Sequence, residues 1–200
     1  DLESMEDGLM EFNPDNLHVL QSEVQHLNML VEDLRMLAQV DAGDLRIEKI
    51  PVELGAIIRE MLERQQSAAR EKKISLQAEL PGEEVFVRGD GQRLAQILIN
   101  LISNALRHTP IEGTVRVQLD CQAQRVIVTV IDNGEGISEA DQKLLFERLY
   151  RVEKSRSRGE GGSALGLSIA RSLVEAHGGE IWVESQEGNG AAFKFWLPLL

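Results

Sequence analysis

The sequence predicts an α+β chain: a two-layer α/β sandwich, with helices covering one face of a mixed sheet, preceded by part of a helical hairpin. Three observations predict it. Apolar residues step by threes and fours before residue 44, which is a helical period. After residue 44, runs of strand-like alternation are interspersed with helical segments. Glycine-rich and polar motifs follow several of these segments. We therefore expect two parts, residues 1–43 and 44–200.

The first part has the pattern of a helical hairpin. Residues 1–10 are predicted to end one helix, and Asn13 and Pro14 suit the start of the next. The apolar seam of that second helix comprises Leu17, Leu20, Val24, Leu27, Val31 and Leu34. Its heptad spacing favours a bundle or dimerisation helix. The alternative is a helix that packs its apolar stripe on its own domain.

The second part is predicted element by element. We expect helices at 53–73, 90–107, 138–145 and 163–177, with Asp90 as an N-cap and Gly178 just past the last helix. Strands are expected at 45–52, 74–80, 85–87, 114–119, 125–131, 180–185 and 191–197. Pro81 and Gly82 are predicted to turn the strands 74–80 and 85–87 into a hairpin.

Composition limits the class of protein. The chain has 21 basic and 33 acidic residues and a net charge of −12, which argues against nucleic acid or an anionic membrane surface as a partner. Cys121 is the single cysteine, so a disulfide within the chain is impossible and a reducing, cytoplasmic setting is favoured. No run approaches the roughly 20 apolar residues of a membrane helix, so we expect a soluble fragment.

The predicted helix 90–107 carries a polar face at its end. Asn100 and Asn104 are four residues apart and share that face. An asparagine amide oxygen can ligate Mg²⁺, Arg107 could meet phosphates, and His108 could stack on a base. The alternative is that the asparagines bond backbone groups.

Asp132, Gly134 and Gly136 lie at a predicted strand end. A carboxylate there can accept a hydrogen bond from the exocyclic amine of adenine. The glycines would let the backbone pass close to a flat ring. The alternative is a plain Asn-Gly turn.

Two further segments suit phosphates. Residues 146–158 are basic within an acidic protein, and as a lid they could bring Arg151, Lys154 or Arg156 onto a ligand. The alternative is a surface loop. Residues 161–167 are rich in glycine and open a helix, where free N–H groups and the helix dipole favour an anion.

In this order, the motifs closely resemble the sensor histidine kinases of bacterial two-component systems. Their catalytic domain belongs to the GHKL ATPase superfamily, which includes gyrase, heat-shock chaperones and mismatch-repair ATPases. The segments starting at Asn100, 132–137, 146–151 and 161–167 resemble the N, G1, F and G2 boxes. Residues 1–43 resemble the second half of the dimerisation and histidine-phosphotransfer hairpin, closest to envelope-stress sensors.

The resemblance implies an ATP site. Asp132 would hold the adenine amine between His108 and Ile137, and Asn104 would ligate Mg²⁺. The implied site comprises Asn100, Asn104, Arg107, His108, Asp132, Gly134, Gly136, Ile137, Tyr150, Arg151, Lys154, Gly162, Ser163, Ala164, Leu165, Gly166 and Leu167. Hydrolysing relatives carry an acidic base where Asn100 stands, so its absence fits transfer to a protein histidine.

The same resemblance implies the activity and partners: ATP is the phosphate donor, a histidine accepts the γ-phosphate, and an aspartate on a response regulator receives it next. It also implies a homodimer formed through the hairpin, in the cytoplasmic part of an inner-membrane protein. None of His18, His26, His108 and His177 has the family's phosphoacceptor context. We therefore expect the chain to begin just after that block and not to autophosphorylate alone.

One position departs from the family pattern. Ala164 stands where the G2 box has its middle glycine. If that position needs a positive φ, alanine costs about 1–2 kcal/mol, which would weaken ATP binding roughly tenfold. One alternative is therefore a nucleotide-impaired dimerisation or docking module. A second, independent of Ala164, is another GHKL ATPase such as an anti-sigma-type serine kinase. The heptad helix argues against the latter.

Overall fold

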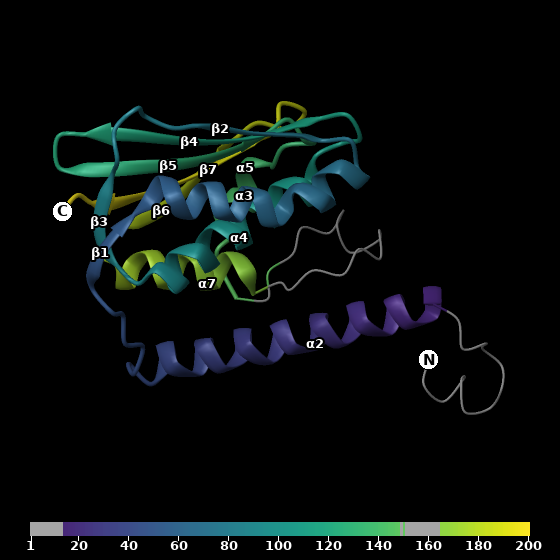
Figure 1. Cartoon of the computed structure of the whole chain (residues 1–200), viewed down its shortest axis with the longest axis horizontal. Coiled ribbons are helices and arrows are strands. Elements are labelled where there is room, and N and C mark those ends of the chain that lie inside the picture. The colour runs from purple at the N-terminus through teal and green to yellow at the C-terminus, as the bar shows by residue number, and fades with distance from the viewer. Residues whose placement is uncertain (1–13, 149, 151–164) are drawn as a thin grey trace. The chain divides into compact units, whose positions relative to one another are not determined.

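The computed structural model describes residues 14–148, 150 and 165–200. They fall into two units that divide between Asp44 and Leu45. Each unit is described by itself, and the elements carry the labels of Figure 1.

The first unit contains the helix α2 (Pro14–Asp41), as the sequence predicts. Part of its apolar seam is open to solvent: Val24, Leu27, Val31 and Leu34 are 56%, 53%, 61% and 59% exposed. This helix of 28 residues therefore has an exposed apolar face, which favours contact with another surface.

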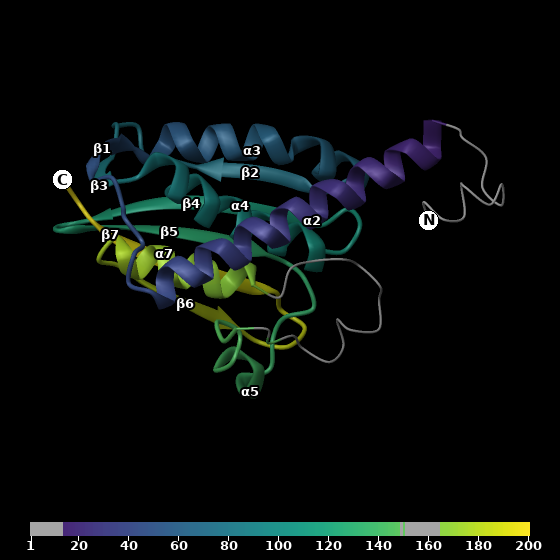
Figure 2. The same cartoon turned by 90° about the horizontal axis from the view of Figure 1, so that it is seen from below.

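The second unit is a sandwich of two layers, which confirms the predicted fold class. One layer is a five-stranded sheet of order β2-β4-β5-β7-β6, formed by Ser75–Glu79, Thr114–Gln122, Arg125–Asp132, Ala191–Pro198 and Glu180–Ser185. Only β2 and β4 pair in parallel, so the sheet is mixed. The helices α3 (Leu54–Glu71), α4 (Gly91–His108) and α7 (Gly166–Ala176) cover one face, with α4 in the middle (Figures 1 and 2).

Strand alternation and helix periodicity build the core between these layers. Val126, Val128 and Val130 of β5 are all 0% exposed, since every second side chain of a strand points to the same face. The stripe of α4 is equally buried, with Ile97 and Leu101 at 0%. The central strand and the central helix therefore form the most buried part of the molecule.

Side-chain caps fix where the helices begin. Asp90 Oδ1 accepts hydrogen bonds from the backbone N–H groups of Gln92 and Arg93, as its predicted N-cap role requires. Glu53 caps α3 in the same way. The backbone N–H of Asp90 donates to Nε2 of the buried His177, at the end of α7, over 3.1 Å. The beginning of α4 is thus tied to the end of α7.

The predicted hairpin of 74–80 with 85–87 is wrong. β3 (Phe86–Gly89) pairs antiparallel with β1 (Ile50–Glu53) in a separate two-stranded sheet, whereas β2 pairs with β4. The strand expected at 45–52 begins only at Ile50. The chain bends at Gly82 and Glu83 without pairing the two flanking strands, because each strand has its partner far away in the sequence.

Two helix boundaries also differ. The short helix α5 (Glu139–Gln142) has Ser138 as its N-cap and ends before the predicted residue 145. α7 begins at Gly166, and its predicted start at 163 lies outside the described residues. Cys121, on β4, is exposed.

Candidate functional site

Asp132 is the last residue of β5, and its side chain is only 6% exposed. Its Oδ1 accepts two backbone hydrogen bonds, from Gly134 at 2.9 Å and from Ala191 at 3.3 Å. The first comes from the following turn and the second from the start of β7. The carboxylate is therefore held in one orientation by two separate segments.

Burial raises the pKa of Asp132 above its ordinary value, while the two backbone hydrogen bonds and His108 act in the opposite direction. Both hydrogen bonds that the described residues donate to this carboxylate fall on Oδ1, so Oδ2 keeps its capacity to accept. A dry, oriented acceptor of this kind suits an exocyclic amine.

Gly134 and Gly136 are needed by the protein backbone itself. A Cβ on Gly134 would lie 2.4 Å from the carbonyl oxygen of His108. Gly136 has a φ of +70°, and a Cβ there would lie 2.1 Å from the carbonyl oxygen of Gln186. The turn after β5 therefore packs tightly against the end of α4 and against the β6–β7 turn, and it places Asp132 beside both.

His108 ends α4 on the other side of this turn. Its Nδ1 lies 3.6 Å from Oε1 of Glu135. Burial lowers the pKa of His108, and the neighbouring Arg107 lowers it further, while Glu135 and Asp132 raise it. The net depression favours the neutral imidazole near pH 7, the form that stacks on a base without adding charge.

Lys72 stabilises the end of α4. Its Nζ donates to the carbonyl oxygens of Leu106 and Arg107, each at 3.3 Å. A cation at a helix C-terminus compensates the negative end of the dipole. The local sequence gives no signal for this contact, because Lys72 lies 34 and 35 residues before its partners. The contact of Ala191 with Asp132 has no local signal for the same reason, because 59 residues separate the two.

Asn100 ties α4 to α7, since its Nδ2 donates to the carbonyl oxygen of Gly166 over 2.9 Å. For Asn100 this matches the alternative that the asparagines bond backbone groups. Asn104 lies one turn later on the same helix and is half-buried. The two asparagines therefore sit between the turn after β5 and the start of α7.

The start of α7 lacks a side-chain N-cap within the described part of the chain. Leu165 occupies the cap position, and its side chain is 5% exposed. The first N–H groups of this helix, around Gly166 and Leu167, consequently receive no side-chain acceptor there. That end of α7 suits an anion.

Tyr150 contacts α5. Its hydroxyl donates to Oδ1 of Asp141. Oδ2 of Asp141 accepts from the hydroxyl of Ser138, whose Oγ in turn accepts from the backbone N–H of Asp141. The remaining predicted site residues lie outside the described residues: Arg151, Lys154, Arg156, Gly162, Ser163 and Ala164. The described residues thus include those that are predicted to bind adenine and some of those that are predicted to bind the phosphates.

Comparison with known proteins adds the family context. Residues 89–200 match the family described as Histidine kinase-, DNA gyrase B-, and HSP90-like ATPase. The histidine-protein kinase BaeS of Escherichia coli (strain K12) is 38% identical over 203 residues, and the sensor histidine kinase WalK of Bacillus subtilis (strain 168) is 34% identical over 202. These alignments cover 100% and 98% of the chain, but the chain spans only 42% and 33% of the two relatives.

A solved structure agrees in fold and sequence. The nucleotide-free catalytic domain of the histidine kinase ThkA matches with a TM-score of 0.67 and 31% identity. The match covers 76% of this chain and 95% of that domain.

Proposed function

The chain belongs to the histidine kinase-, DNA gyrase B- and HSP90-like ATPase family, as the ATP-binding catalytic domain of a sensor histidine kinase, and from that premise we propose that it binds Mg-ATP at the site of Asp132 and passes the γ-phosphate to a histidine outside these residues. The transfer, its acceptor and its partners are proposals, since the chain spans less than half of its relatives' length.

The oriented carboxylate of Asp132 carries this proposal. Oδ2 accepts the exocyclic amine of adenine, while Gly134 and Ala191 hold Oδ1. An adenine seated there lies between the imidazole of His108 and Ile137, whose backbone N–H is anchored on Ser185 Oγ at 2.9 Å. Guanine carries a carbonyl in place of that amine and would meet the carboxylate with repulsion, so the site selects adenine.

The phosphates lie toward α7 in this proposal. The uncapped N–H groups at its start offer hydrogen bonds and the positive end of the dipole, and Arg107 supplies a charge. Within the described residues no cluster of three His, Cys, Asp or Glu could hold a metal. Asn104 fits Mg²⁺, because its amide oxygen is a hard ligand that leaves positions for phosphate oxygens. When bound, the ion would neutralise negative charge on the phosphates.

The absence of a carboxylate at Asn100 supports transfer to a protein rather than hydrolysis. The Asn100 amide donates to the Gly166 carbonyl, and an amide is too weak a base to activate water. The accepted phosphate then passes to an aspartate of a response regulator. The exposed seam of α2 supports a homodimer in the whole protein. We place the domain at the cytoplasmic face of an inner membrane; none of the described helices is long and apolar enough to cross one.

Calorimetric titration with ADP and a non-hydrolysable ATP analogue, with and without Mg²⁺, tests this function. We expect micromolar binding of the analogue that weakens when Mg²⁺ is removed. Absence of binding by the folded chain would overturn the proposal for this sequence and favour a nucleotide-impaired module. Ala164→Gly then distinguishes the causes: regained binding assigns the defect to that position.

A further inference from the structure

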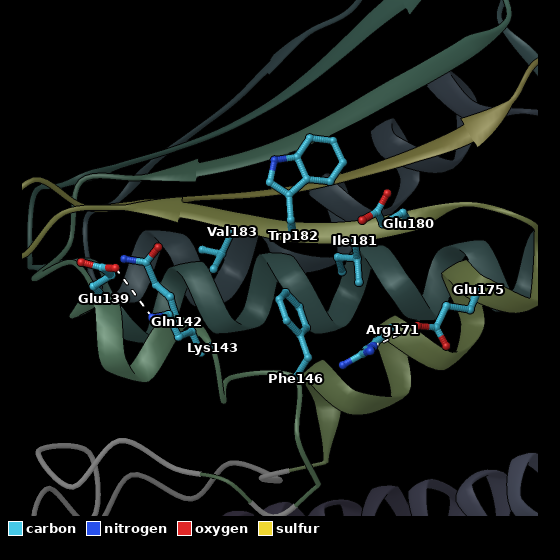
Figure 3. A pocket seen from close by; sticks show the side chains of 10 residues that line it. All are labelled: Glu139, Gln142, Lys143, Phe146, Arg171, Glu175, Glu180, Ile181, Trp182 and Val183. Atoms are coloured by element: carbon cyan, nitrogen blue, oxygen red, sulfur yellow. Dashed lines mark hydrogen bonds and ion pairs between the residues drawn. The ribbon is translucent and has the colours of Figure 1, made fainter.

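A second surface lies along β6. In the described sheet β6 pairs only with β7, so its other edge is free of a strand. A pocket of about 410 Å³ opens beside that edge, between β6, α5 and α7 (Figure 3). None of the residues assigned to ATP lines it. The edge and its pocket are therefore a separate candidate for binding.

Two contacts fix which backbone groups point to the free edge. The N–H of Ala191, the partner of Ser185 in the β6–β7 pair, points toward β5, because it donates to Asp132 Oδ1. The carbonyl oxygen of Ser185 accepts from Gln142 Nε2 on α5 at 2.9 Å, so it points away from β7. Backbone groups alternate sides along a strand, and hence those of Val183 and Ile181 also point to the free edge.

The side chain of Gln142 already takes the place of one backbone N–H of a strand that would pair with this edge of β6. Its amide donates to the Ser185 carbonyl as the N–H of an added strand would, and it also bonds the carbonyl of Ile137. No described residue forms a comparable bond with the outward N–H and C=O groups of Val183 and Ile181. At the free edge of β6, the carbonyl of Ser185 is thus already hydrogen-bonded, whereas the backbone groups of Val183 and Ile181 remain available beside the pocket.

The two faces of this edge differ in chemistry. Ile181 and Val183 point toward Phe146, whose ring packs edge-on against Phe193 with centroids 6.4 Å apart (Figure 3). Trp182 and Glu180 project from the opposite face of the strand. An additional strand would therefore meet an apolar surface on one side and an aromatic, acidic surface on the other.

The uncompensated charge at this edge is negative. Arg171 is engaged by Glu175 at 2.9 Å and by Glu147 at 3.7 Å, and Lys143 lies 3.7 Å from Glu139. Glu180 is exposed and forms no ion pair within the described chain. A cation stacked on Trp182 would be close to this carboxylate.

We propose that the free edge of β6 binds an extended segment of a partner protein as an additional strand, in which apolar side chains alternate with basic ones. The apolar side chains enter the pocket beside Phe146, and the basic ones lie over Trp182 and Glu180. The outward backbone groups of Ile181 and Val183 supply the hydrogen bonds of strand addition.

The test uses the isotope-labelled chain and a synthetic peptide of sequence Lys-Val-Lys-Val-Lys-Val-Lys, followed by NMR. We expect the N–H signals of Ile181 and Val183 to shift and to gain protection from hydrogen exchange. Those of Trp182 and Glu184, which face β7, should gain none. Absence of binding at millimolar peptide, or binding without protection at Ile181 and Val183, would overturn the proposal.

Two control peptides separate backbone pairing from side-chain contact. The same peptide with alternate backbone nitrogens methylated keeps every side chain but cannot pair, and we expect it to bind at least about tenfold more weakly. A peptide with glutamate in place of lysine should not bind. Equal binding of the methylated peptide would refute strand addition, and equal binding of the acidic peptide would refute the charge assignment.

Two matched variants test the edge itself. Val183→Pro and Val183→Ala both replace the branched side chain of valine, but only proline removes the outward N–H, and an edge strand tolerates proline there. We expect the proline variant to bind the basic peptide about tenfold more weakly than the alanine variant. If the proline variant does not fold, the methylated peptide still decides. Self-association of the chain through the same N–H groups would contradict the proposed partner.

Discussion

The two long helices α2 and α4 show the same kind of apolar period but end up in different surroundings. Ile97 and Leu101 of α4 are 0% exposed, whereas Val31 and Leu34 of α2 are 61% and 59% exposed. A period of 3.6 residues shows that a helix has an apolar face. It does not show which surface covers that face, and here the stripe of α4 is covered by the chain's own sheet, while Val24, Leu27, Val31 and Leu34 of α2 are open to solvent.

The buried helix also carries two residues of the proposed site. Because its stripe is locked against β5 and its end is held by Lys72, α4 presents Asn104 and His108 from a rigid support. A site built on packed secondary structure holds its side chains more closely than one built on loops. The exposed helix has no such task within the described residues and suits contact with another chain.

The largest expected difference is in the free energy of unfolding, when one leucine of each helix is replaced by alanine. Leu101→Ala should lower the free energy of unfolding by about 2–5 kcal/mol, since it leaves a cavity in the core. Leu34→Ala should lower it by less than about 0.5 kcal/mol, because the side chain is already in solvent. Denaturation by urea at low protein concentration measures both. Equal losses would mean that α2 is covered in the monomer.

The next effect concerns the site beside α4. Asp132→Asn should weaken ADP binding roughly ten- to a hundredfold, because the amide is a poorer acceptor for the adenine amine and loses a charged hydrogen bond. Titration calorimetry measures it, with Asp120→Asn on β4 as a surface control. Unchanged affinity in the Asp132 variant would disprove the adenine assignment.

A charge placed in the open seam tests the role of α2. We expect the chain to self-associate through this helix, and Val31→Lys should weaken that association about tenfold or more, since the charge would be desolvated at the interface. Ultracentrifugation over a range of concentrations measures the dissociation constant. Glu32→Lys changes the charge beside the seam and is the control. A monomer at all concentrations would refute self-association of this chain.

The smallest expected effect lies where α4 begins. His177 is 4% exposed; its Nδ1 contacts the carbonyl oxygen of Leu173 at 2.7 Å, while Nε2 accepts from the backbone N–H of Asp90. Burial lowers its pKa, so folding favours the neutral ring. The stability that this contributes is present above the unfolded pKa of about 6.5 and is lost as pH falls through the lower folded value.

Urea denaturation between pH 7.5 and pH 5 measures that loss. His177→Asn should be less stable at pH 7.5 and should show a flatter dependence on pH. The pKa of His108 is also lowered, so His108→Asn is the control that removes the contribution of that histidine. An unaltered pH dependence in the His177 variant would contradict its assignment.

Local patterns predicted the elements well and their pairing poorly. Asp90 could be identified as a cap because its partners are two and three residues away. The partner of β3, in contrast, is Ile50–Glu53, and no local signal distinguishes it from a hairpin with β2. Strand pairing depends on side-chain burial and backbone geometry across the whole sheet.

The site shows the same division. Asp132 and His108 could be predicted as residue types in motifs, and the structure brings them together through the turn at Gly134. Nothing in the sequence around Asp132 indicates that Ala191 holds its Oδ1, because 59 residues separate them. Tyr150 was predicted for ATP, whereas its hydroxyl donates to Asp141 of α5.

The strand order also constrains how the chain is made. β7 is synthesised after β6, yet it lies between β5 and β6. While the ribosome is still translating β7, β6 has no neighbour in the sheet, and both of its edges and the aromatic ring of Trp182 are open to other molecules. A newly made β6 is therefore a point at which chaperones or aggregation compete with folding, until β7 inserts between β5 and β6.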